Sequence, residues 1–517
     1  MSLQQNAFLY RTGYSQNKHL YKLLPFRFIA LDPTDWLVVN EVGEYHFINR
    51  STLTALANHS LDPQSQIYAE LKAKHFLVDR EEDALLDVLV TKYRTKKSFL
   101  AGFTKLHTFV VTLRCDHSCL YCQVSRQSAD KLKFDMSEET AQKSVDLMFC
   151  SPSRNITVEI QGGEPLLNFK LIQFLVEYIE EKNRSHRKSI DITITSNLST
   201  LTDEMLAYLK AHRIDLSTSL DGPEVIHNQN RPNGDHSSYA LTIANIKRAR
   251  AVLGYDQVNA LMTTTRLTLQ HPHAVVDEYV KQGFSSIFLR SVSPYGFATR
   301  TKNETGYTMD EFLMFYKKAF ERIVVINRQG THLAEIYAQL LLTKILTPFP
   351  TRYVGLQSPT GFGFGVVVYN YDGNVYASDE SRMLAEMQDY AFCLGNVHEH
   401  TYQELYASKA MRTIAAASCV ETLPGCAECA FQPYCGADPV YHHATQGNVF
   451  GHRPTSGHCL KNMEILKFLF KKLQTRDPVL MGIFFDWLGN RRVKESPASC
   501  PTAQAAAGNS SMLEQVP

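Results

Sequence analysis

The sequence predicts an α/β protein centred on a partial parallel barrel of six β/α units, with a small α+β module before it and a cysteine-rich domain after it. Three observations support this fold class. Short β-branched runs alternate with amphipathic helical segments from residue 105 to about 330. Strand-like runs precede two helical segments between residues 20 and 90. Glycines and cysteines gather between residues 350 and 475.

The composition is that of an ordinary globular protein. The 517 residues are too many for one core, so we expect several domains. A net charge of +1 gives no sign of a nucleic-acid-binding surface, and no apolar run is long enough to cross a membrane. The polar N-terminus lacks the apolar segment of a secretory signal. We therefore expect a cytoplasmic protein without nucleic-acid or membrane partners, whose 11 cysteines are not in disulfides.

The barrel prediction rests on six strand-like segments, "HTFVVTL" being the first, that alternate with helices. The strands are short and β-branched, as buried parallel strands are. The first helix opens at Ser137 with acidic residues in its first turn, which is a helix-start signal. Parallel strands joined by helices form a barrel or a doubly wound sheet. Six units fall short of the eight in a closed barrel.

The flanking regions differ from the barrel in pattern. Over residues 20–90, strand-like runs turn at Asn40 to Gly43, and two helical segments follow, which predicts a winged-helix-type module. The charged stretch up to residue 104 suggests a linker. The region 350–475 begins with a hairpin around Asp372 and Gly373 and ends in a helix. Residues 494–517 are rich in Ala, Ser and Pro and predict a disordered tail.

Eight of the cysteines fall in two groups, and such clustering favours metal binding. The first group directly follows the first barrel strand, at the edge where parallel folds bind ligands. It consists of Cys115, Cys119 and Cys122. Three thiols allow zinc with a water ligand, or a [4Fe–4S] cluster with one iron free for an outside ligand.

The second group lies in the C-terminal region and comprises Cys419, Cys426, Cys429, Cys435 and Cys459. From chemistry alone, zinc and an iron–sulfur cluster suit these thiols equally. We expect Cys150 and Cys393 in the core, and no role for Cys500 in the tail.

Further motifs follow the next strands in order: "QGGEP" (161–165), "TSNLS" (195–199) and "SLDGPEVIHNQNRP" (219–232). Together with the CxxxCxxC spacing, they resemble the radical S-adenosylmethionine (SAM) superfamily. The resemblance implies a [4Fe–4S] cluster on the first three cysteines, with SAM chelating the free iron. It also implies reductive cleavage of SAM to a 5′-deoxyadenosyl radical.

The SAM contacts that the resemblance implies are Tyr121, Gly162, Gly163, Glu164, Ser196, Ser219, Arg231 and Arg266. The two glycines would meet the SAM amino group, Glu164 would order their loop, and the serines would face the ribose. Arg231 would bind the SAM carboxylate, because its guanidinium fork matches a carboxylate. Arg266 is a second candidate, with an ordinary salt bridge as the alternative. Tyr121 would lie near the adenine or form a wall of the cluster pocket. No catalytic acid or base can be identified.

The order of hairpin, "LGNV" (394–397), CxxCx5C and a distant Cys resembles the SPASM domain, which follows radical SAM cores acting on peptides and usually holds two auxiliary [4Fe–4S] clusters. Two expected thiols are missing, because Ser378 and Pro439 stand in their places. We expect the first auxiliary cluster to be absent, or altered with Asp379 or Asp438 as an oxygen ligand. One auxiliary cluster remains, on Cys426, Cys429, Cys435 and Cys459.

Phrases such as "FLRSVSPYGFA" (288–298) and "GHRPTSGHC" (451–459) resemble the His-Xaa-Ser system radical SAM maturases, the HxsB family, over residues 20–475. This implies modification of a ribosomally made precursor with His-Xaa-Ser repeats, together with companion maturation proteins and an electron donor. The N-terminal module is then similar to a RiPP recognition element, which binds a leader peptide as an added strand. A packing domain and a DNA-binding winged helix are its alternatives. Two other functions stay open: sulfatase-maturase-like oxidation of Ser or Cys, and a non-catalytic, zinc-stapled peptide-binding adaptor.

Overall fold

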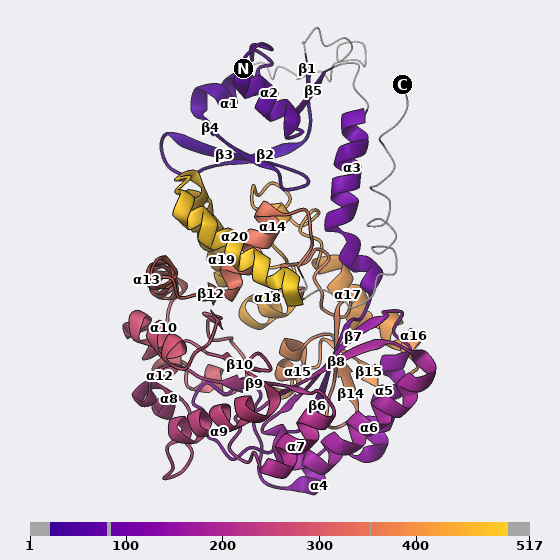
Figure 1. The fold of residues 1–517 in the computed structure, drawn as a ribbon. Coiled ribbons are helices and arrows are strands. Elements are labelled where there is room, and N and C mark those ends of the chain that lie inside the picture. The colour runs from indigo at the N-terminus through magenta and orange to yellow at the C-terminus, as the bar shows by residue number, and fades with distance from the viewer. Residues whose placement is uncertain (1–20, 80–83, 352, 495–517) are drawn as a thin grey trace, which may run out of the picture.

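A computed structural model describes residues 21–79, 84–351 and 353–494 of the protein. Figure 1 shows a small module at one end of the molecule, the main sheet at the other, and helices between them. Residues 495–517, the predicted tail, and Cys500 within it lie outside the described residues.

The centre of the fold is an eight-stranded sheet of order β10-β9-β8-β7-β6-β13-β14-β15. Its strands are β6 (Leu106–Thr112), β7 (Asn155–Gly162), β8 (Ser189–Thr195), β9 (Asp215–Ser219), β10 (Val258–Leu261), β13 (Val366–Tyr369), β14 (Asn374–Tyr376) and β15 (Cys393–Asn396). Strands β6 to β10 are parallel neighbours, which confirms five of the six predicted units. The sixth strand, β11 (Ser286–Ile287), pairs instead with β12 (Ala334–Glu335), and only a bridge between Thr264 and Ser291 joins this segment to the end of the barrel.

Helices follow the barrel strands as the alternation predicts (Figure 1). They are α4 (Lys131–Phe134), α5 (Glu138–Phe149), α6 (Phe169–His186), α7 (Asp203–Ala211), α8 (Glu224–Asn230), α9 (Ser238–Leu253), α10 (Pro272–Lys281), α11 (Phe297–Arg300), α12 (Lys302–Thr305) and α13 (Met309–Arg328). Helix α5 begins after Ser137, whose hydroxyl accepts a hydrogen bond from the Thr140 amide, as its sequence predicts.

The predicted hairpin of the cysteine-rich region belongs to the main sheet. Strand β13 pairs in parallel with β6, and β14 turns back beside β13 through Gly373, whose φ of +83° suits glycine. The sheet therefore connects the barrel directly to the C-terminal region.

Seven further helices complete the C-terminal region: α14 (Ile336–Leu346), α15 (Asp379–Ala385), α16 (Tyr402–Ala407), α17 (Lys409–Ala417), α18 (Pro439–Gln446), α19 (Gly457–Gln474) and α20 (Pro478–Lys494). Helix α20 packs on α13 and α14 through the fully buried Trp487, whose ring lies 5.8 Å from that of Phe320. Short 3₁₀ turns lie at 98–102, 165–168, 268–270, 354–356, 432–434 and 453–455. Within the described ranges, no helix combines the length and the apolar character needed to span a bilayer.

The N-terminal module has its own small core, and the predicted strands precede two helices, with an unpredicted strand added at each end. It contains β1 (Tyr21–Leu23) paired with β5 (Leu77–Asp79), an antiparallel sheet of β2 (Phe26–Ala30), β3 (Asp35–Asn40) and β4 (Tyr45–Asn49), and the helices α1 (Arg50–Ala57) and α2 (Gln66–Ala73). The stretch up to residue 104, for which we expect a linker, contains a helix that the sequence analysis did not predict, α3 (Ala84–Lys96), and this helix buries none of its residues.

Candidate functional site

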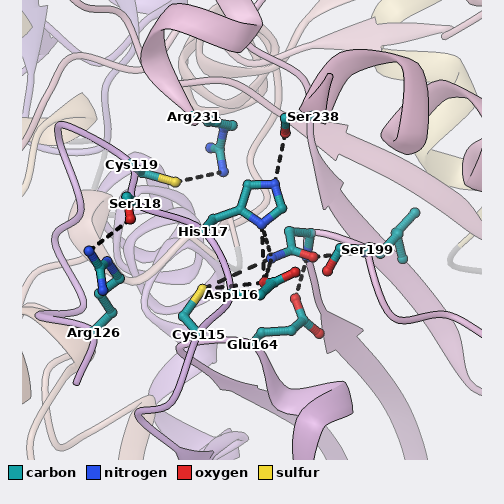
Figure 2. Close-up of polar contacts among 12 residues, drawn as sticks. Cys115, Asp116, His117, Ser118, Cys119, Arg126, Glu164, Ser199, Arg231 and Ser238 are labelled. Carbon is teal, nitrogen blue, oxygen red and sulfur yellow. Dashed lines mark hydrogen bonds and ion pairs between the residues drawn. The ribbon is translucent and has the colours of Figure 1, made fainter. Parts of the chain in front are cut away.

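The first three thiols lie in the loop that follows β6, at the end of the parallel strands. Figure 2 shows two of them, Cys115 and Cys119. The Ser118 and Leu120 amides donate to the carbonyls of Pro232 and Asn230, so the loop is fastened to the segment after α8. Cys115, Cys119 and Cys122 are free and half-buried. The fold thus presents three accessible thiols where parallel folds bind ligands.

The "GGE" segment after β7 runs against the start of this loop. The Gly163 amide donates to the Thr112 carbonyl and the Glu164 amide to the Arg114 carbonyl, both at 2.8 Å. A Cβ at Gly162 would lie 2.1 Å from the Thr112 oxygen, and one at Gly163 would lie 2.3 Å from the Arg114 oxygen. These glycines are therefore needed for the close approach of two loops at the site.

Glu164 joins the ends of two strands. Its fully buried carboxylate accepts hydrogen bonds from the Leu166 amide at 3.0 Å, the Ser196 hydroxyl at 2.7 Å and the Asn197 amide at 2.7 Å. Burial raises the pKa of Glu164 to about 7, although these donors oppose the rise. Ser196 is thus engaged with Glu164, and its amide neighbour Asn197 reaches the cysteine loop.

Asp221 organises the other side of the site. Its buried carboxylate accepts from Arg231 Nε at 3.0 Å, the Tyr121 hydroxyl at 2.6 Å and the Thr263 amide at 3.2 Å. The Arg231 guanidinium lies 5.2 Å from the centre of the Tyr121 ring, and its Nη1 is 4.0 Å from Cys119 Sγ. Asp221 therefore holds a cation beside the thiols, as Figure 2 shows for Arg231 and Cys119.

The structure does not bring every predicted SAM contact to this place. Arg266 is exposed, and its Nε donates to the Gly306 carbonyl at 2.9 Å, so no contact joins it to the cysteine loop. Ser219 ends β9, and its half-buried hydroxyl has no hydrogen-bond partner among the described residues. Tyr121 forms a wall beneath Arg231.

Several residues that contact the loop were missed by sequence reasoning. The Asn197 side-chain amide donates to Asp116 at 2.8 Å and lies 4.0 Å from Cys115 Sγ. His117 is hydrogen-bonded to Ser238 at 2.8 Å (Figure 2). Gly296, with φ +61°, packs against the Cys122 carbonyl, where a Cβ would lie at 2.6 Å. Asn197 and Gly296 lie within the "TSNLS" and "YGFA" segments that the sequence analysis singled out, but only the fold shows that they contact the cysteine loop.

The electrostatics of the loop suit iron ions bound by thiolates. Burial, and after it Glu164 and Cys119, raise the pKa of the Cys115 thiol, and burial raises the pKa of Cys119 to about 12. Bound iron ions would offset the cost of deprotonating these half-buried thiols, because a thiol that coordinates a metal is deprotonated. The buried Arg382 adds an Nη2 without a hydrogen-bond partner in the described structure, while its Nη1 donates to the Val124 carbonyl beside the loop. The residues present therefore fit an anionic, thiolate-bound cluster.

The second cysteine group also forms a coherent set. Burial, and after it the neighbouring cysteine sulfurs, raise the pKa of Cys459 to about 11. The same two causes raise the pKa of Cys429 to about 12. Arg453 Nε donates to Cys426 Sγ at 3.0 Å, and the Asn462 amide donates to Cys435 Sγ at 3.5 Å. Hydrogen-bond donors to the sulfurs, and the electrostatic repulsion among the four sulfurs when deprotonated, suit one auxiliary cluster.

The remaining cysteines lie outside both sets. Cys419 is half-buried near Lys97 and Glu421. The expectation that Cys150 lies in the core is wrong, because it caps α5 and is exposed; Cys393 is half-buried. Across the described ranges, no three His, Cys, Asp or Glu side chains are placed around a single metal ion.

The two positions of the missing SPASM thiols begin helices. Ser378 is the N-cap of α15, with its hydroxyl accepting from the Ser381 amide at 3.2 Å. Asp438 is the N-cap of α18, and Pro439 is its first residue. Asp379 is bound by Arg382 Nε at 2.9 Å. Each of these residues thus has a structural partner.

Comparisons with known proteins agree with this geometry. A model of the radical SAM superfamily matches residues 109–278. The cysteine-type anaerobic sulfatase-maturating enzyme of Clostridium novyi is 24% identical over 350 residues, which cover 65% of this chain and 88% of that enzyme. The radical SAM cyclopropyl synthase TigE of Paramaledivibacter caminithermalis is 23% identical over 168 residues, 30% of this chain and 34% of the synthase.

Solved structures share the fold. Native anSMEcpe with bound AdoMet aligns with a TM-score of 0.59 at 18% identity, over 74% of this chain and 99% of that one. Streptococcus suis SuiB bound to its precursor peptide SuiA aligns with a TM-score of 0.50 at 13% identity, over 84% of this chain and 98% of SuiB. Sequence match, fold and thiol loop lead to one conclusion: residues 109–278 form a radical SAM domain, and the chain is an enzyme similar to anaerobic sulfatase maturases and peptide-modifying radical SAM enzymes, with a [4Fe–4S] cluster and SAM as cofactors.

Proposed function

We propose that this enzyme modifies a ribosomally made polypeptide of the His-Xaa-Ser repeat type, as a member of the HxsB family. The observation that supports this proposal is the position of "FLRSVSPYGFA", one of the sequence segments on which the resemblance rests. Its Gly296 packs on the loop of the three thiols, and the Phe297 amide donates to the Cys122 carbonyl at 2.8 Å. The phrase that distinguishes the family therefore forms part of the site wall.

The site residues would divide the work as follows. Cys115, Cys119 and Cys122 hold the cluster, and Arg231, oriented by Asp221, holds the carboxylate of SAM. The chemistry that a reduced cluster and SAM would supply there is radical abstraction of hydrogen from the polypeptide. The Glu164 network keeps the loops around the thiols in register. The protein thus orients the cofactor and shields it from water.

We assign leader-peptide binding to the N-terminal module, residues 20–90, ahead of a core at 105–330 and an auxiliary domain at 350–475. Strand β2 is an outer strand of its sheet, and Phe28 on it is 52% exposed. An outer strand offers unpaired main-chain groups to which a peptide can add. Companion maturation proteins and an electron donor complete the system, in the cytoplasm.

A second candidate is oxidation of a Ser or Cys side chain, as the names of the sulfatase-maturating relatives suggest. The two positions where SPASM thiols are missing, Ser378 and Pro439, instead begin helices, which favours the first proposal. Tandem mass spectrometry of the treated precursor tests this candidate, because it requires a change confined to one Ser or Cys side chain: loss of two hydrogens from Ser, or from Cys loss of two hydrogens and then replacement of sulfur by oxygen from water, with release of H2S.

The test is anaerobic reconstitution with iron and sulfide, followed by metal analysis. We expect about eight iron atoms per chain, falling to about four in the Cys115→Ala/Cys119→Ala/Cys122→Ala variant, since each [4Fe–4S] cluster holds four. Cys150→Ala, which changes an exposed thiol outside both groups, is the control and should keep all the iron. Zinc without iron would contradict the proposal and support the adaptor. Formation of 5′-deoxyadenosine, measured alongside, reports SAM cleavage.

A further inference from the structure

A small cavity lies where α3, the end of α14 and the cysteine-rich region meet. Three lysines, two buried polar side chains and one auxiliary-cluster cysteine are among its lining residues: Lys96, Lys97, Lys344, Thr351, Gln432 and Cys435. None of the residues assigned to the SAM site lines it. The cavity is therefore separate from the site described above.

The cavity carries more positive than negative charge. Lys96 Nζ donates to the Lys344 carbonyl at 2.9 Å, and Lys344 Nζ donates to the carbonyls of Leu356 and Cys435. Neither of these ammonium groups is paired with a carboxylate in the described structure. Lys97 is different, because it is paired with Glu421.

The second acidic residue in the lining is also paired. Glu41 binds Arg27 at 3.1 Å, so it is not available to balance the lysines. Burial lowers the pKa of Lys96 to about 8, which means that its charge is costly where it lies. Two half-buried lysine amino groups thus have no carboxylate partner in the described structure.

Two polar side chains in the lining also lack partners. The Thr351 hydroxyl and the Gln432 side-chain oxygen are buried without a hydrogen bond in the described structure, and these residues are only 3% and 4% exposed. Buried polar groups are normally satisfied, so such orphans call for a ligand. The Thr351 hydroxyl can donate to an anion, whereas Gln432 Oε1 requires a donor from the ligand.

From this combination we infer that the cavity binds a carboxylate with a neighbouring hydrogen-bond donor. The carboxylate would bind between Lys96, Lys344 and the Thr351 hydroxyl, and the donor would meet Gln432. An acidic residue of a bound polypeptide, with its own main-chain amide, has this chemistry. A free amino acid with an acidic side chain has it as well.

The position of the cavity links the ligand to the auxiliary cluster, a link that rests on the assignment of Cys435 as a cluster ligand. Cys435 is part of the cavity wall, so a carboxylate bound there would be near the cluster that Cys435 would hold. Added negative charge near a cluster disfavours its reduced form. Binding should therefore lower the reduction potential of the auxiliary cluster and leave that of the SAM cluster unchanged.

Calorimetric titration of the reconstituted full chain tests the inference. The probes are L-glutamate and an acetylated, amidated triglutamate peptide, which distinguish a free acid from a polypeptide source. Saturable binding of at least one probe is expected. In Lys96→Gln, loss of a charge-assisted bond should weaken binding by roughly tenfold or more.

Thr351→Val is the decisive variant, because its hydroxyl has no partner to lose on removal. It should weaken probe binding while leaving the urea unfolding midpoint unchanged. Lys92→Gln is the matched control, because Lys92 lies on the same helix but pairs with Glu44 outside the cavity lining. No saturable binding, or equal affinity in wild type, Lys96→Gln and Thr351→Val, would overturn the inference. SAM cleavage in the same preparations reports separately on the proposed function.

Discussion

Asp221 should be the most sensitive charged residue of the barrel. It is fully buried and accepts two hydrogen bonds from Arg231, at 3.0 and 3.4 Å, and one from Tyr121 at 2.6 Å. Asp221→Asn removes the charge and leaves the Arg231 guanidinium, whose side chain is only 12% exposed, without a counter-ion. Breaking one side of a buried ion pair costs about 3–5 kcal/mol, so we expect a loss of that size in the free energy of unfolding.

The double variant Asp221→Asn/Arg231→Leu distinguishes the cost of an unpaired buried charge from the cost of lost packing. Because it removes both members of the pair, it should be more stable than Asp221→Asn alone. Asp203→Asn is the matched control, because Asp203 also pairs with an arginine, Arg248, but is 85% exposed. An exposed pair contributes about 0.2–1 kcal/mol, so this change should matter little.

The assay is urea unfolding of the metal-free protein under reducing conditions, which removes any contribution from a cluster. The module has a small core of its own, but Leu37 and Val39 from its strand β3 belong to the main core, so coincidence of the transition by two probes is checked before free energies are compared. The reasoning is refuted if Asp221→Asn unfolds within about 1 kcal/mol of the Asp203→Asn control. It is also refuted if the effects of Asp221→Asn and Arg231→Leu simply add.

Three further outcomes follow from single contacts. Burial raises the pKa of Glu335 from 4.5 to about 6, so between these pH values the native state binds a proton that the unfolded state does not. Relative to Glu335→Gln, the wild-type protein should therefore lose about 2 kcal/mol of unfolding free energy as the pH rises through this window. If the unfolding free energies of the two proteins in urea change in parallel with pH, the prediction is contradicted. Gly163→Ala places a Cβ 2.3 Å from a carbonyl oxygen and should remove about four of the reconstituted iron atoms, whereas Gly102→Ala, with open space around it, should keep them all. Arg453→Leu removes the donor to Cys426 and should lower the auxiliary-cluster potential in an EPR-monitored redox titration, and an unchanged potential would argue against that contact.

The barrel strands and their helices could be predicted because their signals are local. Period, β-branching and first-turn acids identify α5 after Ser137 without knowledge of any partner. Contacts across the sheet have no such signal. The pairing of β13 with β6 joins residues more than 250 positions apart, and nothing in "GVVVY" specifies that partner. For the same reason, the hydrogen bond of Asn197 to Asp116 was missed although its motif was found.

Helices α3 and α20 were missed for two different reasons. Helix α3 buries none of its residues and exposes Leu86 and Val90, so it lacks the apolar face that marks a packed helix. Helix α20 is apolar on more than one side, because Phe485 is 55% exposed while Trp487 is buried. A helix whose packing is decided by distant partners gives a weak periodic signal.

The two absent SPASM thiols also show why substitution alone should not restore a cluster. Cysteine at position 378 would remove the N-cap of α15, and cysteine at 439 would remove the proline at the first position of α18. Losing a cap costs about 1 kcal/mol. Burial, and next the nearby Glu380, raise the pKa of Asp438 to about 7, so an anionic cluster would add negative charge where it is already disfavoured. Iron in Ser378→Cys/Pro439→Cys should therefore stay at about eight atoms per chain, and a rise to about twelve would mean that two thiols suffice to rebuild the site.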